Sequence, residues 1–195
     1  MLVRIRQEVQ EVPRRLTAPS PPLADDAVRL EPLDERHVAD FERMLDDAHI
    51  VRHTRVPTNP PNGFAAKWVG RYVKGWQDGS CAGFAILSKD AEFLGLAGLV
   101  DLDLHARQGE IGYAVLGAAR GRGVAGRALR LVTDWAFEAL GLERVELRID
   151  VDNEPSIRVA ERAGYCREGV FRSLHFKEDA RADLAIYSLL AGDPR

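Results

Sequence analysis

A glycine-rich turn in the middle of the chain carries the residues whose types and spacing most clearly suggest chemistry. The stretch 110–127 reads EIGYAVLGAARGRGVAGR, a strand-like run followed by closely spaced glycines and the start of a helix. Glycines let a backbone approach a ligand closely, and a helix N-terminus adds partial positive charge. The glycines are Gly121, Gly123 and Gly126, and the arginines around them are Arg120, Arg122 and Arg127. Together they predict a site for a pyrophosphate-like anion.

This turn matches neither of two common nucleotide-binding motifs. The GxxxxGK[ST] pattern of a P-loop is absent from it. Residues 121–126 fit GxGxxG by letter, but the strand before them lies among antiparallel-looking strands. No βαβ unit with an acidic residue about 20 positions further on supports a dinucleotide site cleanly. A tight connection that binds nothing is the plain alternative.

The segments around the turn alternate between strand-like and helix-like patterns. Apolar residues recur at every second position in the strand-like runs and at helical spacing in the others. The expected strands are residues 28–33, 81–88, 93–104, 110–116, 144–151, 167–174 and 182–190. The expected helices follow Asp34, cover 64–76 and 121–140, and start at Asn153, with a proline-rich loop over 54–63. This order predicts an α+β fold, a mixed and mostly antiparallel sheet with helices on its faces.

Four aromatic residues lie at every fourth position of the helix expected over 64–76: Phe64, Trp68, Tyr72 and Trp76. Such spacing places them on one face of the helix. An aromatic face packs in a core or lines a substrate pocket, and the spacing leaves both open.

Composition narrows the class of protein. The 195 residues suit one compact domain, and 46% hydrophobic with 29% charged residues is ordinary for a globular chain. A net charge of −3 gives no footprint for nucleic acid or a membrane surface. The two cysteines, Cys81 and Cys166, make no disulfide framework, and the absence of a Cys/His cluster of metal-ligand spacing predicts no metal.

The N-terminal segment differs from the rest of the chain. Residues 1–26 are charged and then rich in proline, so we expect an arm and linker before a single domain over 27–195. The first residues lack the apolar core of a signal peptide, and the chain has no apolar run of about 20 residues that could span a bilayer. A cytoplasmic location is therefore expected.

The glycine turn and the segments after it resemble one family. Residues 120–125, RGRGVA, resemble the R/Q-x-x-G-x-G/A signature of the GNAT N-acetyltransferases. Residues 149–172 and 181–190 resemble the second half of the fold in its RimJ/RimL-like branch, the ribosomal-protein N-terminal acetyltransferases. The residues that carry this likeness are Asn153, Ser156, Gly164-Tyr165 and Glu168-Gly169. The match covers roughly residues 27–192.

The resemblance implies a fold and a cofactor. It implies six or seven strands, splayed between the fourth (110–116) and the fifth (144–151), with acetyl-CoA wedged in the gap. The backbone N–H near Val115 would face the developing oxyanion, Ser156 the leaving thiolate or pantetheine, and Asn153 the pantetheine arm. The turn that would hold the pyrophosphate comprises Arg120, Gly121, Arg122, Gly123, Val124, Ala125 and Gly126. The plain alternative for Asn153 and Ser156 is a helix cap and its first turn.

Two residues compete for the role of general base. Relatives often place a carboxylate at the position of Glu110, where it works through water. His175 lies nineteen residues after Ser156, where the RimL-like branch can carry a catalytic Glu, and histidine titrates near neutral pH. The third alternative is no single base, with water carrying the proton.

The predicted activity is transfer of acetyl from acetyl-CoA to a primary amine, in a protein N-terminus or in a small molecule such as an aminoglycoside, a polyamine or an amino acid. A non-catalytic acyl-CoA-binding regulatory domain is the alternative of another class. An exposed last strand would favour a homodimer.

Overall fold

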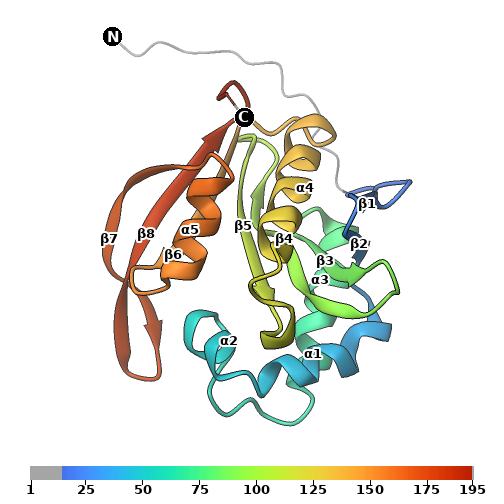
Figure 1. Cartoon of the computed structure of the whole chain (residues 1–195), viewed down its shortest axis with the longest axis vertical. Coiled ribbons are helices and arrows are strands. Elements are labelled where there is room, and N and C mark those ends of the chain that lie inside the picture. Colours follow the sequence, from blue (N-terminus) through green and yellow to red (C-terminus); the bar gives the residue numbers. More distant parts are fainter. Residues whose placement is uncertain (1–14, 195) are drawn as a thin grey trace.

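The structure, a computed structural model, describes residues 15–194. Eight strands within this range form one sheet in the order β1-β2-β3-β4-β5-β6-β8-β7 (Figure 1). The strands are β1 (Leu23–Ala24), β2 (Val28–Pro32), β3 (Ala82–Ser88), β4 (Phe93–Asp103), β5 (Gln108–Val115), β6 (Arg144–Asp150), β7 (Cys166–Lys177) and β8 (Ala180–Leu190). Each neighbouring pair is antiparallel except β5 and β6. The predicted mixed sheet is confirmed, and the two-residue β1 extends it beyond the six or seven strands expected.

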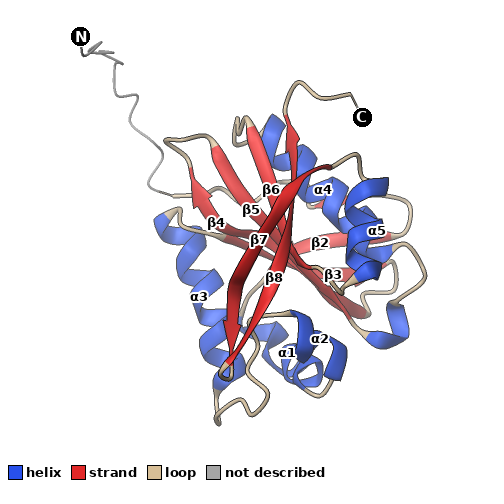
Figure 2. Ribbon diagram, turned by 90° about the vertical axis from the view of Figure 1, so that its left-hand side faces the viewer, coloured by secondary structure: helices blue, strands red, loops and turns tan. Residues whose placement is uncertain are grey.

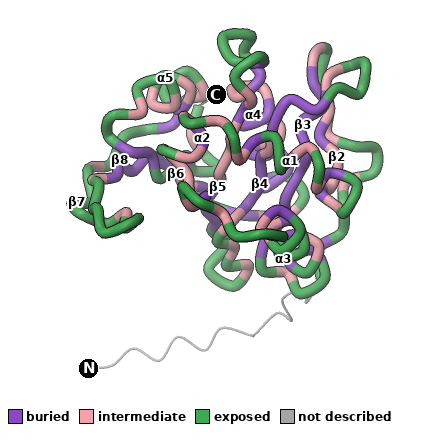
Figure 3. The backbone as a smooth tube through the Cα atoms, turned by 90° about the horizontal axis from the view of Figure 1, so that it is seen from below, coloured by how far each residue is buried: buried purple, intermediate pink, exposed green. Residues whose placement is uncertain are grey.

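Helices cover both faces of the sheet (Figure 2). They are α1 (Val38–Leu45), α2 (Ala48–His53), α3 (Phe64–Asp78), α4 (Val124–Glu138) and α5 (Glu154–Arg162). The first three pack a core around Phe41 and Met44, whereas α4 and α5 pack a second core around Leu129 and Ala160. Figure 3 shows how the inner strands β3 and β4 are buried while β7 at the sheet edge is exposed. None of the described helices is long and apolar enough to cross a membrane.

The sheet opens between β5 and β6. These two strands pair in parallel only where Gln108–Glu110 faces Arg144–Glu146. Beyond that point β5 runs on to Val115 and β6 to Asp150 without pairing with each other. Helix α2 lies at the open end of the gap between them (Figure 1). The splay predicted between the fourth and fifth strands is therefore confirmed. It leaves backbone groups of both strands free to face a ligand.

Part of the predicted N-terminal arm lies outside the described residues. The rest, residues 15–26, packs on the domain: Leu16 is buried, and its N–H donates to the carbonyl of Trp76. Strand β1 pairs with β2, and Asp25 forms an ion pair with Arg127 of α4. A boundary at residue 26 stays a prediction.

Candidate active site

The glycine turn joins β5 to α4 through backbone that favours glycine. Gly121 and Gly123 have φ of 74° and 77°, left-handed backbone values that residues with a Cβ rarely adopt. Gly123 is the N-cap of α4, and no side chain caps the helix there, so its first N–H groups face outward. A cavity lies over this turn. We call it the turn cavity, and its lining includes Val115, Arg120, Gly121, Gly123, Val124, Ala125, Gly126, Asn153, Ser156, Arg158 and Arg162.

All the predicted cofactor-binding residues line the turn cavity except Arg122. The other predicted arginines are held by carboxylates. Arg120 pairs with Asp47 at 2.6 Å and donates from Nε to the carbonyl of Val115, while Arg127 pairs with Asp25 at 2.8 Å. These two arginines brace the turn, which leaves the backbone N–H groups of the turn as the groups available to an anion.

Two arginines outside the predicted set add positive charge to the turn cavity. Arg158 and Arg162 come from α5 and both line it. Arg158 also pairs with Glu154 one helical turn away, at 3.1 Å. Their spacing of four residues places them on the same side of a helix, a signal that was available in the sequence once α5 was assigned.

The backbone of Val115 faces the gap in the sheet. The N–H of Leu116 donates to the carbonyl of Leu94 in β4. Neighbouring residues of a strand point their N–H groups to opposite sides, so the N–H of Val115 points away from β4. It faces the side where β6 has already separated, and its carbonyl accepts from Arg120 on that side.

A hydroxyl pair lies where α5 approaches β5. The hydroxyl of Tyr113 lies 2.7 Å from Oγ of Ser156 and also donates to the Ser156 carbonyl at 3.3 Å. Burial raises the pKa of Tyr113 to about 12. Oδ1 of Asn153 accepts from the N–H of Ser156 at 3.4 Å, so Asn153 does cap α5. Tyr113 was outside the predicted set because the alternation of β5 gave it the same pattern as its apolar neighbours.

A second cavity lies along β5 and reaches α1, α2 and α3. We call it the inner cavity, and its lining includes Phe41, Met44, Trp68, Arg71, Tyr72, Glu110, Gly112, Arg148, Asp150 and His175. Trp68 and Tyr72 of the predicted aromatic face belong to it, and Arg71 stacks on both rings. Trp76, further along the same face, packs against Phe84 and Trp135 in the core. The aromatic face of α3 thus lines the cavity at its middle and fills the core at its end.

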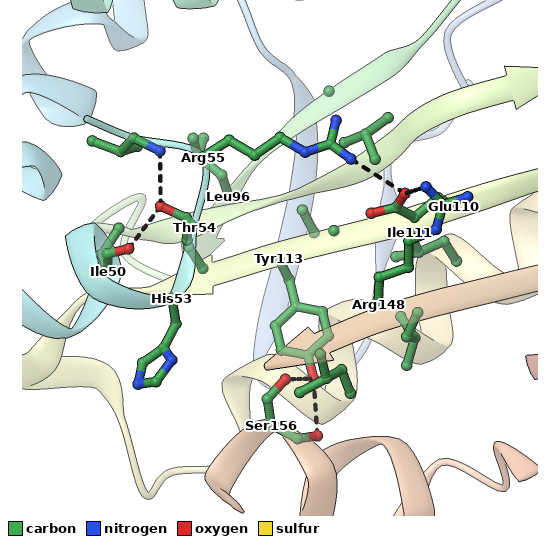
Figure 4. Close-up of a pocket in the computed structure, with 18 of the residues that line it drawn as sticks. Ile50, His53, Thr54, Arg55, Leu96, Glu110, Ile111, Tyr113, Arg148 and Ser156 are labelled. Carbon is green, nitrogen blue, oxygen red and sulfur yellow. Dashed lines mark hydrogen bonds and ion pairs between the residues drawn. The ribbon is translucent and has the colours of Figure 1, made fainter. Parts of the chain in front are cut away.

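Glu110 projects into the inner cavity from β5. Its carboxylate is 3.3 Å from Arg148 and 3.5 Å from Arg55, and the residue is 8% exposed (Figure 4). Burial raises the pKa of Glu110 to about 7, and the two arginines oppose that rise. Asp101, beside it on β4, adds to the rise. A carboxyl with this pKa can take up or release a proton near neutral pH.

His175 forms a hydrogen bond with a buried carboxylate, that of Asp150 at the end of β6. Its Nδ1 lies 3.1 Å from Oδ1 of Asp150, and Nδ1 of His53 lies 3.1 Å from Oδ2 of the same group. His53 comes from the end of α2 and was not in the predicted set. Ligand atoms of His53, Asp150 and Asp152 lie within 4.8 Å of one another, a grouping that the His53–Asp150 hydrogen bond explains without a metal.

The two cavities meet. Seven residues line both of them: Ile50, His53, Thr54, Tyr113, Ala114, Asn153 and Ser156. In Figure 4, Tyr113 points down to Ser156, with His53 on one side and Glu110 further along β5. This arrangement can hold one ligand by its anionic end over the glycine turn and a second ligand in the inner cavity, with their reactive ends at the junction.

Comparisons with known proteins identify a family. The family model described as an acetyltransferase (GNAT) domain matches residues 27–166. YdaF of Bacillus subtilis, named as a candidate ribosomal N-acetyltransferase, is 38% identical over 101 residues, which cover 52% of this chain and 55% of YdaF. Spermidine N(1)-acetyltransferase of Escherichia coli K12 is 27% identical over 143 residues, covering 73% of this chain and 75% of that enzyme.

A solved structure shares the fold. RimL, a ribosomal L7/L12 alpha-N-protein acetyltransferase in complex with coenzyme A, superposes with a TM-score of 0.78 at 19% identity, covering 87% of this chain and 96% of RimL. Among the curated relatives, the match to YdaF spans little more than half of that protein.

Proposed function

The chain belongs to the GNAT acetyltransferase family, and we propose that it transfers the acetyl group of acetyl-CoA to a primary amine. The observation that carries the proposal is the junction of the two cavities. The turn cavity offers an anion site, the inner cavity offers room for an acceptor, and Ser156 lies where they meet. We take residues 27–195 as the catalytic domain.

The proposed cofactor position follows from the turn cavity. The backbone N–H groups from Gly121 to Gly126 bind the pyrophosphate, because they are uncapped and lie at a helix N-terminus. Arg158 and Arg162 supply charge from α5. The pantetheine arm then runs along the gap between β5 and β6, past Asn153, toward the junction.

The proposed reaction is a direct attack of the amine on the thioester. The amine nitrogen forms a bond to the carbonyl carbon, and the carbon–sulfur bond breaks as the thiolate leaves. The N–H of Val115 faces the gap and donates to the developing oxyanion. The hydroxyl of Ser156 gives its proton to the thiolate, and Tyr113 returns one to Ser156 across 2.7 Å. The proton that the attacking nitrogen loses as the amide forms passes through water to Tyr113.

The predicted bases both line the inner cavity. Glu110 and His175 each belong to its lining, and neither is among the residues shared with the turn cavity. Both stand on the acceptor side of the site, where they can hold the ammonium form of an incoming amine. A cavity that reaches Ser156 from this side also favours an enzyme over a regulatory domain that only binds acyl-CoA.

The acceptor is a primary amine of a protein N-terminus or of a small molecule. Relatives of both kinds occur, since YdaF is named for ribosomal proteins and the E. coli enzyme for spermidine. The last strand, β8, is not an edge as expected, because it pairs with β6 and β7. The predicted homodimer is supported instead by β7, an edge strand with exposed Phe171, Leu174 and Phe176. The cytoplasmic location stays a prediction.

The test is release of free thiol from acetyl-CoA in the presence of N-terminal peptides, aminoglycosides, polyamines and amino acids, assayed separately. Turnover with one class supports the proposal and identifies the acceptor. Tight binding of acetyl-CoA without turnover on any class would contradict it and favour a regulatory domain.

A further inference from the structure

His53 holds a position that neither predicted base holds. Among the seven residues that line both cavities, it is the one that carries an imidazole, the side chain that acts most often as a general base. It lies at the end of α2, on the side of the junction opposite α5 (Figure 4). We propose that His53 is the general base that takes the proton from the acceptor amine, with Asp150 as its positioning residue. This inference rests on the proposed acetyl transfer.

Asp150 fixes the orientation of the His53 ring. Its side chain is 8% exposed, and each of its carboxylate oxygens lies 3.1 Å from the Nδ1 of one histidine, His53 or His175. An ionised carboxylate only accepts hydrogen bonds, so each Nδ1 must carry the proton. Each neutral ring then presents an unprotonated Nε2. The Nε2 of His53 has no hydrogen bond to any described residue and is available to accept a proton.

Location separates the two histidines that share Asp150. His175 lies on β7 and lines the inner cavity alone, whereas His53 also lines the turn cavity, where the thioester must arrive. A base has to reach the amine at the moment of attack, within hydrogen-bond distance or through one water. Glu110 is further along β5, beyond Tyr113, and is engaged by Arg55 and Arg148.

Charged groups surround His53 on all sides. His49 lies one helical turn earlier, with ring centroids 4.6 Å apart, and burial lowers the pKa of His49. Asp152 lies 3.8 Å from the ring and pairs with Arg52. Lys177 of β7 donates to the carbonyls of Val51 and Thr54 beside it. Negative charge from Asp150 and Asp152 therefore faces the ring itself, and it stabilises the imidazolium formed when the proton arrives.

The proposed step removes two protons from the acceptor nitrogen. An ammonium acceptor gives one proton to Nε2 of His53, which becomes imidazolium, and the neutral amine attacks the thioester carbonyl. The thiolate departs with a proton from Ser156, and the second proton, which the nitrogen loses as the amide forms, passes through water to restore the Ser156–Tyr113 pair. The imidazolium returns its proton to solvent after the product leaves, and no oxidant or metal is needed.

The test compares three Asn variants. His53→Asn keeps an N–H toward Asp150 but cannot accept a proton, His175→Asn makes the same change at the other ring, and His105→Asn changes an exposed loop residue. With the best amine of the panel at pH 7, we expect His53→Asn to lower kcat about 100-fold or more, with acetyl-CoA affinity within about twofold of wild type. His175→Asn should lose less, and His105→Asn should match wild type.

The pH profile distinguishes a base from a structural residue. In the wild type, kcat/KM should fall on the acid side of the profile, where His53 is protonated and cannot accept the proton of the amine. In His53→Asn the part of the acid-side fall that is due to His53 should vanish. The rate of this variant should keep rising with pH as the free amine becomes abundant. A loss in His53→Asn of less than roughly tenfold, or one no larger than in His175→Asn, overturns the assignment.

A measurement without turnover separates this inference from the proposed function. Nitrogen NMR of the histidine rings in the wild-type protein with acetyl-CoA reports which nitrogen carries the proton. We expect His53 and His175 both as the Nδ1–H form. The Nε2–H form at His53 would overturn the inference even if the enzyme is active. Absence of turnover with the Nδ1–H form present would instead contradict the proposed function.

Discussion

At the residue scale, the hydroxyl pair of Tyr113 and Ser156 joins two segments that lie 43 residues apart. We predict that Ser156→Ala lowers kcat by about 100-fold, because the thiolate then leaves without its proton donor. The affinity for acetyl-CoA, measured by calorimetry, should stay within about twofold. Tyr113→Phe is the matched comparison, since it keeps the serine donor and should lose less. An unchanged kcat in Ser156→Ala would reduce the residue to part of a helix cap.

Glu110 makes a second residue-scale prediction, about pH and stability. Its pKa is raised from 4.5 to about 7 in the folded protein, so the folded state binds this proton more tightly than the unfolded state. The raised pKa therefore adds to the free energy of unfolding at low pH. This contribution of roughly 3 kcal/mol is complete below pH 4.5 and is lost as the pH rises to 7. Glu110→Gln stays neutral throughout and should not lose it.

Urea unfolding of both proteins at pH 5 and pH 7.5 checks this. The free energy of unfolding of wild type, relative to Glu110→Gln, should fall between the two pH values. Parallel behaviour of the two proteins would show that the carboxyl is already ionised in the folded state at pH 5.

At the element scale, the proposed pyrophosphate site combines the glycine turn with the start of α4. We predict that Gly123→Glu abolishes measurable binding of acetyl-CoA, because a carboxylate would then face the pyrophosphate over the uncapped helix end. The chain offers a matched control in Gly63, the N-cap of α3, with φ of 75° against 77° for Gly123. Gly63→Glu imposes the same backbone strain outside the turn cavity. The affinity of this variant for acetyl-CoA should equal that of the wild type. Equal affinity in both variants would remove the turn from the cofactor site.

The elements themselves were predictable from local pattern. Alternation over 144–151 predicted a strand that the structure places at Arg144–Asp150, and Asn153 was recognisable as the start of α5. Contacts that depend on the closed fold were not. Arg127 meets Asp25 across 102 residues, and His53 meets Asp150 across 97 residues. Hydrophobic periodicity carries no information about such distant pairs. The glycine turn could therefore be predicted as a site, but the carboxylates that hold its arginines and the position of His53 at the junction could not.

At the scale of the whole molecule, the splay of the sheet lets the two cavities meet beside Tyr113 and Ala114 of β5. The edge strand β7 lies at the border of the same sheet, twelve residues long and largely exposed. Phe171 and Phe176 are 53% and 57% exposed on it. An uncovered edge with apolar side chains favours pairing with a second copy.

We therefore predict a homodimer at micromolar concentration, measured by light scattering during gel filtration. Phe171→Lys together with Phe176→Lys should shift the mass to that of one chain while acetyl-CoA affinity is retained. A wild-type mass of one chain would contradict a dimer through β7.

In the proposed reaction, one acetyl group moves from acetyl-CoA to an amine at the junction of the two cavities. The most direct measurement counts the free thiol released and, by mass spectrometry of the same reaction, the amine that has gained an acetyl group. Equal amounts of both products, dependent on the amine and lost in Ser156→Ala, are expected. Thiol release without an acetylated amine, or no release with any class of amine, would contradict the account.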